Sequence, residues 1–252
     1  MSDAVNLFLA NGRYSTDADL SSGLRGLRLG GRSVLLYSRL MTFGRILSSE
    51  AIARILQMFI EEVGPGGTLC VPAYTFSSYR NETFDVKQSK PRVGVLGDIA
   101  CTAAGFVRTV HPIYSTSCWG KHVETLTKQD PTTCFGPGSF FDVFTTLPEP
   151  YIVMLGTNLS AVTLAHHYDQ LFGVPGRFRK MFRGSILRDG QKVDIEFDSF
   201  VRDHDFYKDR APCFGRFDAV AEELGFIERQ SCMGDWVHGI RECDFRRLYR
   251  AC

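Results

Sequence analysis

The sequence predicts an α/β fold, organised as one domain over residues 1–252, with a central mixed sheet, flanking helices and a small antiparallel addition. Three short apolar runs with the length and flanks of buried strands support this fold class: 33–37, 68–71 and 151–155. A helical pattern separates the first two runs. Because strand–helix–strand units favour parallel strands with a right-handed crossover, we expect part of the sheet to be parallel.

The first half of the chain contains the clearest elements. Residues 1–30 are polar and we expect them to be irregular, after which Gly30-Gly31 leads into the first strand. Ser48-Ser49-Glu50 is typical of a helix start, and the helix that follows has an apolar face made by Ile52, Ile55, Leu56, Phe59 and Ile60. Gly64-Pro65-Gly66-Gly67 should end this helix just before the second strand.

Weaker patterns predict the later elements. In chain order they are a polar surface loop over 77–93, a helix over 97–104, a helix over 163–172 with Thr163 as a possible cap, a hairpin over 177–198 around Asp189-Gly190, and helices over 217–224 and 242–250. The hairpin is the antiparallel addition. Since the chain has no internal repeat and no low-complexity linker, a single domain is the simplest organisation.

Composition excludes several classes of protein. The hydrophobic fraction is 44% and the charged fraction 23%, which is typical of a globular chain. A net charge of +1 argues against a nucleic-acid partner, because such proteins carry a basic excess. No apolar run approaches the roughly 18 residues that span a bilayer, so we expect no membrane association. The segment Met1-Ser2-Asp3 is acidic rather than basic, which predicts no secretory signal and a cytoplasmic location.

The eight cysteines predict neither a zinc site nor a disulfide framework. They stand at positions 70, 101, 118, 134, 213, 232, 243 and 252, and no pair has the spacing of a zinc knuckle. A chain of this length can build a core without covalent cross-links. We therefore expect reduced thiols and no metal.

The sharpest chemical pattern is the pair His166 and Asp169. The two residues are three apart on a predicted helix, so their side chains share a face, just past the end of the strand 151–155. A carboxylate beside an imidazole fixes its tautomer and makes it the kind of general base that proton abstraction needs. A surface pair or a capped core histidine explains the same spacing. His167 should face another way.

A second segment, Arg108 to Ser115, leaves alternatives open. His111-Pro112 is first of all a turn signal. Arg108 is either a solvated charge or a clamp for phosphate or carboxylate. Cys118 lies near two histidines in the sequence, but nothing indicates an activated thiolate there.

Seven segments occur in a definite order: Tyr37-Ser38-Arg39-Leu40, Val63-Gly64-Pro65-Gly66-Gly67-Thr68-Leu69, Pro72-Ala73-Tyr74-Thr75, Arg108 to Ser115, Phe135 to Phe141, Leu155-Gly156, and Thr163 to Asp169. With this order and spacing the chain, from about residue 23 to its end, resembles the antibiotic N-acetyltransferase family, whose best-known members are aminoglycoside 3-N-acetyltransferases. The resemblance implies the α/β fold peculiar to that family. It also implies acetyl-CoA as donor and direct transfer to a primary amine in a ternary complex.

The resemblance assigns roles to individual residues. The catalytic histidine of the family falls on His166 and its orienting acid on Asp169, where the family usually has Glu. The pantetheine arm of the donor would pass Ser38 and the Tyr74-Thr75 segment. Further positions follow from the resemblance: Arg39, in place of a second Ser, belongs to the cofactor side, and His111, Ser115, Asp98 and Thr163 belong to the substrate side.

The acceptor predicted from charge is a small molecule with one amino group. A polycationic drug needs a cleft lined by carboxylates, and no acidic cluster lies near the matched segments. Four cations in or beside those segments suit a phosphate of CoA or of a nucleotide-linked sugar: Arg39, Arg45, Arg108 and Lys121. For the oxyanion of the reaction we expect donors among the backbone amides near Gly156 or the hydroxyls of Thr163 and Thr75.

Two other functions compete with acetyl transfer. One is a metal-dependent hydrolase that uses His111, His166, His167 and Asp169, although their spacing is not that of a metal motif. The other is a relative that binds a CoA ester or a sugar without turnover. Arg39 and Asp169, which depart from the family pattern, support this second alternative.

Overall fold

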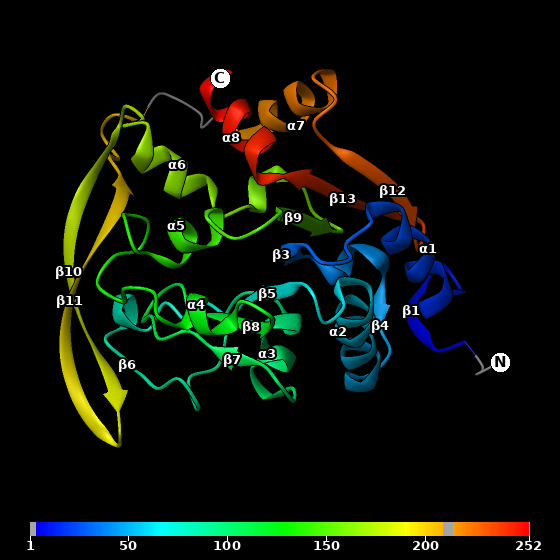
Figure 1. Cartoon of the computed structure of the whole chain (residues 1–252), viewed down its shortest axis with the longest axis horizontal. Helices are drawn as coiled ribbons and strands as arrows, with labels where there is room; N and C mark the ends of the chain where they lie inside the picture. The colour runs from blue at the N-terminus through cyan, green and yellow to red at the C-terminus, as the bar shows by residue number, and fades with distance from the viewer. Residues whose placement is uncertain (1–3, 209–213, 252) are drawn as a thin grey trace.

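A seven-stranded mixed sheet lies at the centre of the computed structural model, which describes residues 4–208 and 214–251 (Figure 1). Within these residues the strand order is β12-β13-β9-β3-β5-β8-β7. Three central strands are parallel to one another: β9 (Pro150–Leu155), β3 (Ser33–Ser38) and β5 (Thr68–Pro72). The outer strands pair antiparallel: β13 (Asp235–Arg241), β12 (Glu228–Cys232), β8 (Thr116–Gly120) and β7 (Val107–Arg108). The predicted α/β class with a mixed sheet is confirmed.

The strand–helix–strand unit β3–α2–β5 forms as the sequence predicts. Helix α2 (Ser49–Val63) begins after Ser48, whose hydroxyl accepts a hydrogen bond from the amide of Ala51 at 3.3 Å. It ends at Gly64, which has a positive φ of 66°. Its apolar face packs on the sheet, and β3 and β5 pair in parallel.

Two hydrophobic clusters cover the two faces of the sheet, because side chains alternate along each strand. Val34 and Leu36 of β3 join one cluster, and Leu35 and Tyr37 join the other. The first cluster contains residues of α2, α1 (Asp17–Leu27) and α3 (Val95–Thr102). The second contains residues of α5 (Phe140–Thr145), α6 (Ala165–Leu171) and α8 (Glu242–Ala251).

The expectation of an irregular N-terminal segment is wrong. Residues Asn6–Ala10 (β1) and Arg13–Thr16 (β2) form a hairpin that pairs further with β4 (Arg45–Ile46), and α1 follows at once. Asn11 and Gly12 turn the chain with φ of 50° and 73°, values that suit an Asn-Gly turn. Thr16 then caps α1 with a capping box that includes Asp19.

The expected surface loop over 77–93 is correct only in part. It contains a 3₁₀ turn, η2 (Ser78–Arg80), and the two-residue strand β6 (Thr83–Phe84), which pairs with the predicted hairpin. The remaining elements, with the bounds that the structure gives, are η1 (Leu40–Phe43), α4 (Val123–Thr127), η3 (Leu159–Ala161) and α7 (Phe214–Glu223).

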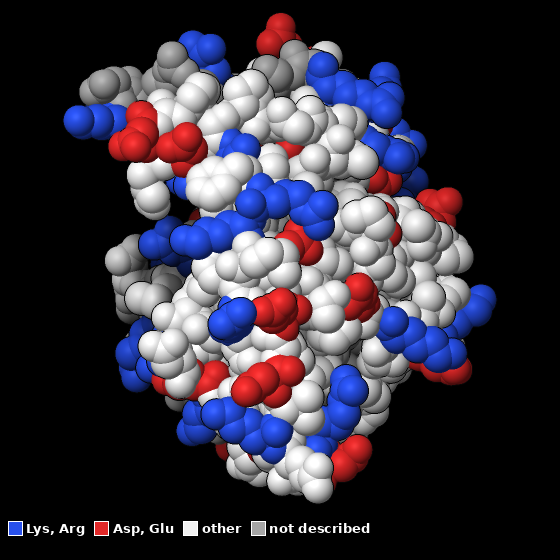
Figure 2. Space-filling model, turned by 90° about the vertical axis from the view of Figure 1, so that its left-hand side faces the viewer, with Lys and Arg blue, Asp and Glu red and all other residues white. Residues whose placement is uncertain are grey.

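The predicted hairpin is longer than expected and flanks the molecule as a curved ribbon (Figure 1). Its strands are β10 (Arg177–Arg188) and β11 (Gln191–Arg202), which pair antiparallel along their whole length. Figure 2 shows this side of the molecule, where Lys and Arg side chains form a band with Asp and Glu interspersed. Two ion pairs on the hairpin, Arg179–Asp198 and Arg183–Glu196, neutralise part of that charge.

Two further expectations concern the state of the cysteines and the presence of membrane-spanning segments. Six cysteines in the described part of the chain are free thiols, and Cys213 and Cys252 lie outside it. No helix among residues 4–208 and 214–251 has the length and apolar character needed to cross a bilayer.

Candidate functional site

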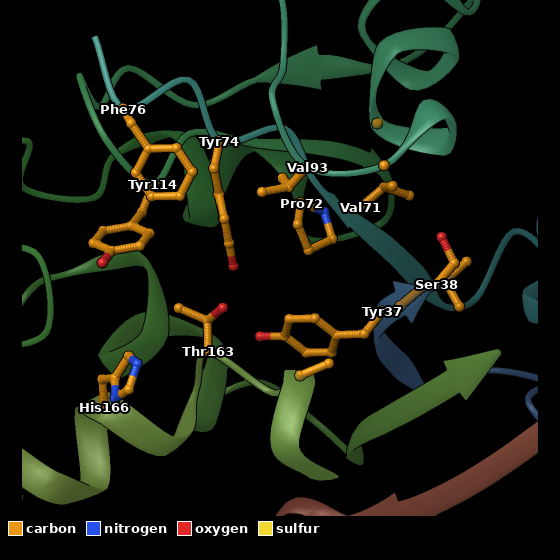
Figure 3. A pocket seen from close by; sticks show the side chains of 14 residues that line it. Tyr37, Ser38, Val71, Pro72, Tyr74, Phe76, Val93, Tyr114, Thr163 and His166 are labelled. Atoms are coloured by element: carbon orange, nitrogen blue, oxygen red, sulfur yellow. The ribbon is translucent and has the colours of Figure 1, made fainter. Parts of the chain in front are cut away.

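A cavity of about 350 Å³ opens at the carboxyl ends of β3 and β5, the edge of parallel strands where α/β folds bind ligands (Figure 3). The segment after β5, the start of α3 and the turn before α6 complete its wall. The lining residues come from five separate stretches of the chain: Leu36, Tyr37, Ser38, Val71, Pro72, Tyr74, Phe76, Val93, Gly94, Gly97, Tyr114, Ala161, Thr163 and His166.

Two glycines permit the close packing that shapes this end of the sheet. A Cβ on Gly97 would lie 2.3 Å from the carbonyl oxygen of Pro72, so only glycine lets α3 approach the end of β5. Gly156 has a φ of 65°, and a Cβ there would lie 2.8 Å from the carbonyl oxygen of Arg39. The chain can therefore leave β9 sharply and turn back toward α6.

His166 and Asp169 lie on one face of α6, as their spacing predicts. Nδ1 of His166 donates a hydrogen bond to Oδ2 of Asp169 over 2.9 Å, and the guanidinium of Arg177 contacts the same oxygen at 3.0 Å. The imidazole side chain is 27% exposed, whereas the Asp169 and Arg177 side chains are 6% and 5% exposed. A buried, ion-paired carboxylate thus holds the imidazole in one orientation at the edge of the cavity.

Three hydroxyl groups gather inside the cavity, from Tyr37, Tyr74 and Thr163, and Figure 3 shows them pointing toward one another. The amide of Leu164 donates a hydrogen bond to Oη of Tyr37 over 3.2 Å. Burial raises the pKa of Tyr37, and burial with the neighbouring Tyr37 phenol raises the pKa of Tyr74. Both phenols therefore keep their protons at neutral pH and can donate hydrogen bonds.

His111 lies behind the cavity wall rather than on it. Its Nδ1 accepts hydrogen bonds from the amides of Ile113 at 3.1 Å and Tyr114 at 2.9 Å, and the residue is 2% exposed. Burial lowers the pKa of His111 to about 4. The imidazole is a neutral group that fixes the turn from which Tyr114 enters the cavity.

Ser115, Thr75 and Arg108 also hold the wall from behind. The hydroxyl of Ser115 donates to the carbonyl oxygen of Ala73 at 2.7 Å, and that of Thr75 donates to the carbonyl oxygen of Pro112 at 3.2 Å. Arg108, 8% exposed, donates to the Ala73 carbonyl at 2.7 Å and to Oγ of Ser115 at 3.2 Å. Arg108 is therefore not a solvated charge, and the bonds of its guanidinium hold the wall together.

Arg39 and Asp98 are exposed and do not line the cavity. Each directly follows a lining residue, Ser38 in the first case and Gly97 in the second. The structure therefore does not place either side chain on the cavity surface, and each is only adjacent in sequence to a residue that lies there. Thr163 lines the cavity but does not cap α6: the helix begins at Ala165, and Leu164 occupies the cap position without a side-chain bond.

The residues that a metal-dependent hydrolase or a cysteine nucleophile would use do not come together in one site among the described residues. Nδ1 of His167 lies 2.7 Å from the carbonyl oxygen of Phe135, so this buried side chain faces away from the cavity, as predicted. Cys118 is buried opposite Cys70 in the sheet. In the part of the chain that the structure describes, no three His, Cys, Asp or Glu side chains come together as a metal site would require.

Arg177, Tyr37 and Tyr114 are site residues that the sequence does not single out. Arg177 opens β10 and reaches Asp169 only through tertiary packing, so no local spacing indicates the contact. Tyr37 and Tyr114 lie inside recognised segments, next to Ser38 and Ser115. There an aromatic residue fits a core position as well as a cavity wall.

Comparison with known proteins gives a consistent result. The model of the aminoglycoside 3-N-acetyltransferase family matches residues 35–241. The chain is also 26% identical over 200 residues to aminoglycoside N(3)-acetyltransferase VII of Streptomyces paromomycinus. The aligned residues make up 71% of this chain and 68% of that protein.

Solved structures share the fold at lower identity. The YokD protein from Bacillus subtilis superimposes with a TM-score of 0.78 at 16% identity, over 93% of this chain and 91% of that one. AAC-IIIb in a binary complex with CoASH gives 0.76 at 20% identity, over 92% and 93% of the two chains. AAC-VIa bound to sisomicin gives 0.79 at 20% identity, over 92% and 94%.

Proposed function

The chain belongs to the aminoglycoside 3-N-acetyltransferase family, a family of acyltransferases, and we propose that it transfers the acetyl group of acetyl-CoA to a single primary amine with His166 as the general base. The observation that carries this proposal is the hydrogen bond between His166 and a buried Asp169 at the edge of the cavity. Asp169 replaces the usual Glu of the family, yet its carboxylate reaches Nδ1 directly.

His166 would move one proton in each direction. Most primary amines are protonated at neutral pH, and only the neutral form attacks a thioester. As the nitrogen–carbon bond forms, the second ring nitrogen of His166 takes a proton from the amine, while the carbonyl electron pair moves onto oxygen. When the tetrahedral adduct collapses, the carbon–sulfur bond breaks and the imidazolium returns the proton to the CoA sulfur. Asp169 keeps the imidazole aligned and is a positioning residue.

The donor would enter along Ser38 and Tyr74, which line the same cavity as His166. A relative of the same fold, AAC-IIIb, is known as a complex with CoASH, and this supports a CoA ester as donor. Arg39, the exposed residue that follows Ser38, is suited to a phosphate of CoA. Thr75 acts differently from the initial expectation, because its hydroxyl is used within the wall and only its backbone shapes the passage.

The lining of the cavity favours an acceptor molecule that carries few positive charges. Of the described residues that line the cavity, none is Asp, Glu, Lys or Arg. Thr163 faces the cavity, and we assign Asp98, the exposed residue that follows the lining residue Gly97, to the ammonium group of an incoming acceptor. We therefore propose a mono-amino sugar, free or nucleotide-linked, rather than a polycationic drug. His111 and Ser115 support this side of the cavity from behind.

One assay separates the candidate functions. The protein is incubated with acetyl-CoA and a panel of amino sugars, nucleotide-linked amino sugars and kanamycin-type drugs, and release of CoA thiol is followed. We expect acetylation without added metal, with higher kcat/KM for the mono-amino sugars. Activity that is lost on chelation and restored by zinc would instead indicate a hydrolase. Drugs that exceed the sugars tenfold would refute the acceptor assignment alone.

The general base is tested by His166→Ala. Turnover should fall at least about a hundredfold, while thermal stabilisation by acetyl-CoA persists, because proton transfer is lost and the donor site is kept. His122→Ala is the matched control: this histidine follows β8 at the opposite end of the sheet from the cavity. Turnover close to wild type in His166→Ala would refute the assignment.

A further inference from the structure

Tyr74 presents a buried hydroxyl group that the fold itself does not use. The residue is 3% exposed, and its ring packs edge-on against Tyr114 at 5.1 Å and against Phe76 at 6.3 Å between centroids. Among the described residues, Oη of Tyr74 has no hydrogen-bond partner at normal distance and angle. In Figure 3 this oxygen points into the cavity toward Thr163, three residues before His166.

A buried hydroxyl group without a hydrogen-bond partner lowers the stability of the folded chain unless an atom of a bound ligand supplies that partner. Burying a polar group without a partner costs free energy, and phenylalanine would make the same ring contacts without that cost. Because the ring is held by two aromatic neighbours, the hydroxyl cannot turn out to solvent without breaking that packing. Its position is therefore explained best by a bound molecule that supplies the missing partner.

The missing partner is a hydrogen-bond acceptor. The hydroxyls of Tyr37 and Thr163 lie near enough to shift the pKa of Tyr74, but neither is a hydrogen-bond partner of Oη of Tyr74 at normal distance and angle. The protonated phenol of Tyr74 is a donor, and the cavity around it is mainly apolar in its lining. A carbonyl oxygen that gains negative charge is the acceptor that such a preorganised donor stabilises most.

Two other donors expected for the oxyanion are used elsewhere. The amide of Gly156 donates to the carbonyl oxygen of Trp236 at 3.3 Å, and the Thr75 hydroxyl donates to Pro112. We infer that the Tyr74 hydroxyl donates a hydrogen bond to the acyl carbonyl oxygen of the bound CoA ester and stabilises the tetrahedral oxyanion. The inference rests on the proposed function and extends it. In the step, the carbonyl electron pair moves to the oxygen that Tyr74 binds and returns when the carbon–sulfur bond breaks.

The kinetic test is Tyr74→Phe against Tyr151→Phe. Tyr151 is an equally buried tyrosine whose Oη also lacks a partner of normal geometry among the described residues, but it belongs to the cluster on the other face of the sheet. We expect Tyr74→Phe to lower kcat by about 10²–10³-fold with KM values within about twofold, and Tyr151→Phe to leave kcat unchanged. Tm should stay equal or rise in Tyr74→Phe, since an unpaired hydroxyl is removed.

A purely structural role would lower Tm in Tyr74→Phe together with activity, and that result, or a kcat within threefold of wild type, would overturn the inference. A spectroscopic arm needs no turnover. Acetyl-CoA labelled with ¹³C at the carbonyl is bound to His166→Ala and to the His166→Ala/Tyr74→Phe double variant, and the carbonyl stretch is compared by infrared difference. A lower frequency only when Tyr74 is present supports the inference, and equal frequencies contradict it. Failure of acetyl-CoA to bind either protein would refute the proposed function instead.

Discussion

His111 predicts a specific dependence of stability on pH. Burial lowers its pKa in the folded chain to about 4 from the ordinary value of 6.5, so the unfolded chain binds a proton in this window that the folded chain does not. The free energy of unfolding must therefore fall as pH decreases through 6.5 and level off below about pH 4. The full difference corresponds to about 3 kcal/mol, of which about 2 kcal/mol is lost by pH 5.

Urea unfolding at pH 7.5 and pH 5.0 measures this effect in wild type and in His111→Asn. The side-chain oxygen of asparagine can accept the amides of Ile113 and Tyr114 as Nδ1 of the imidazole does, and it carries no titrating proton. We expect wild type to lose about 2 kcal/mol more than the variant between the two pH values. Burial also lowers the pKa of His238, but this contribution is present in both proteins and cancels.

An equal pH difference in the two proteins would show that His111 is charged or accessible in the folded chain. In that case the turn at 111–114 would not be held by a neutral imidazole, and a place for His111 on the cavity surface would again be open. An unchanged urea dependence of the free energy in the variant serves as the control that both proteins unfold by the same amount.

Arg177 and Gly97 provide two further tests. Arg177→Gln removes the cation that holds the Asp169 carboxylate beside His166, so kcat should fall by roughly tenfold to a hundredfold through misalignment of the imidazole. Arg177→Lys should restore most of the activity, and an unchanged kcat in Arg177→Gln would contradict the coupling. Gly97→Ala should cost about 1–3 kcal/mol and lower activity, because its Cβ meets the Pro72 carbonyl, whereas Gly30→Ala, whose Cβ would make only an ordinary contact with the Glu62 carbonyl oxygen at 3.8 Å, should be nearly neutral in thermal unfolding.

The sequence predicts those helices and strands whose identity depends on residues close together in the chain. The apolar face of α2 and its Ser48 cap identify that helix, and the buried runs identify β3, β5 and β9. The N-terminal hairpin was missed although Asn11-Gly12 is a recognisable turn signal, because only β1 is apolar and its partner β2 is polar. Strands β12 and β13 lack a clear alternation and are defined by long-range pairing, of β13 with β9 and of β12 with β13.

The same distinction between local contacts and tertiary contacts applies to the residues of the site. His166 and Asp169 were predictable because their contact lies within one helix turn, whereas the contact of Arg177 with Asp169 depends on how β10 packs. Tyr74 and Thr75 show a further limit. Successive side chains of an extended segment point to opposite sides, so only one of two neighbours could enter the cavity, and the sequence does not say which.

The charge of the site connects the catalytic pair with the choice of acceptor. A carboxylate near the general base is also what would hold an ammonium group, and Asp169 is the acid beside His166. That carboxylate is already bound to Arg177 and 6% exposed, so little of its negative charge reaches the cavity. With uncharged groups on the remaining lining, discrimination among acceptors falls to hydroxyl and aromatic contacts. On our proposal, such contacts select the shape of a sugar that carries one amine, and the lining lacks the carboxylates that would hold a second or third ammonium group.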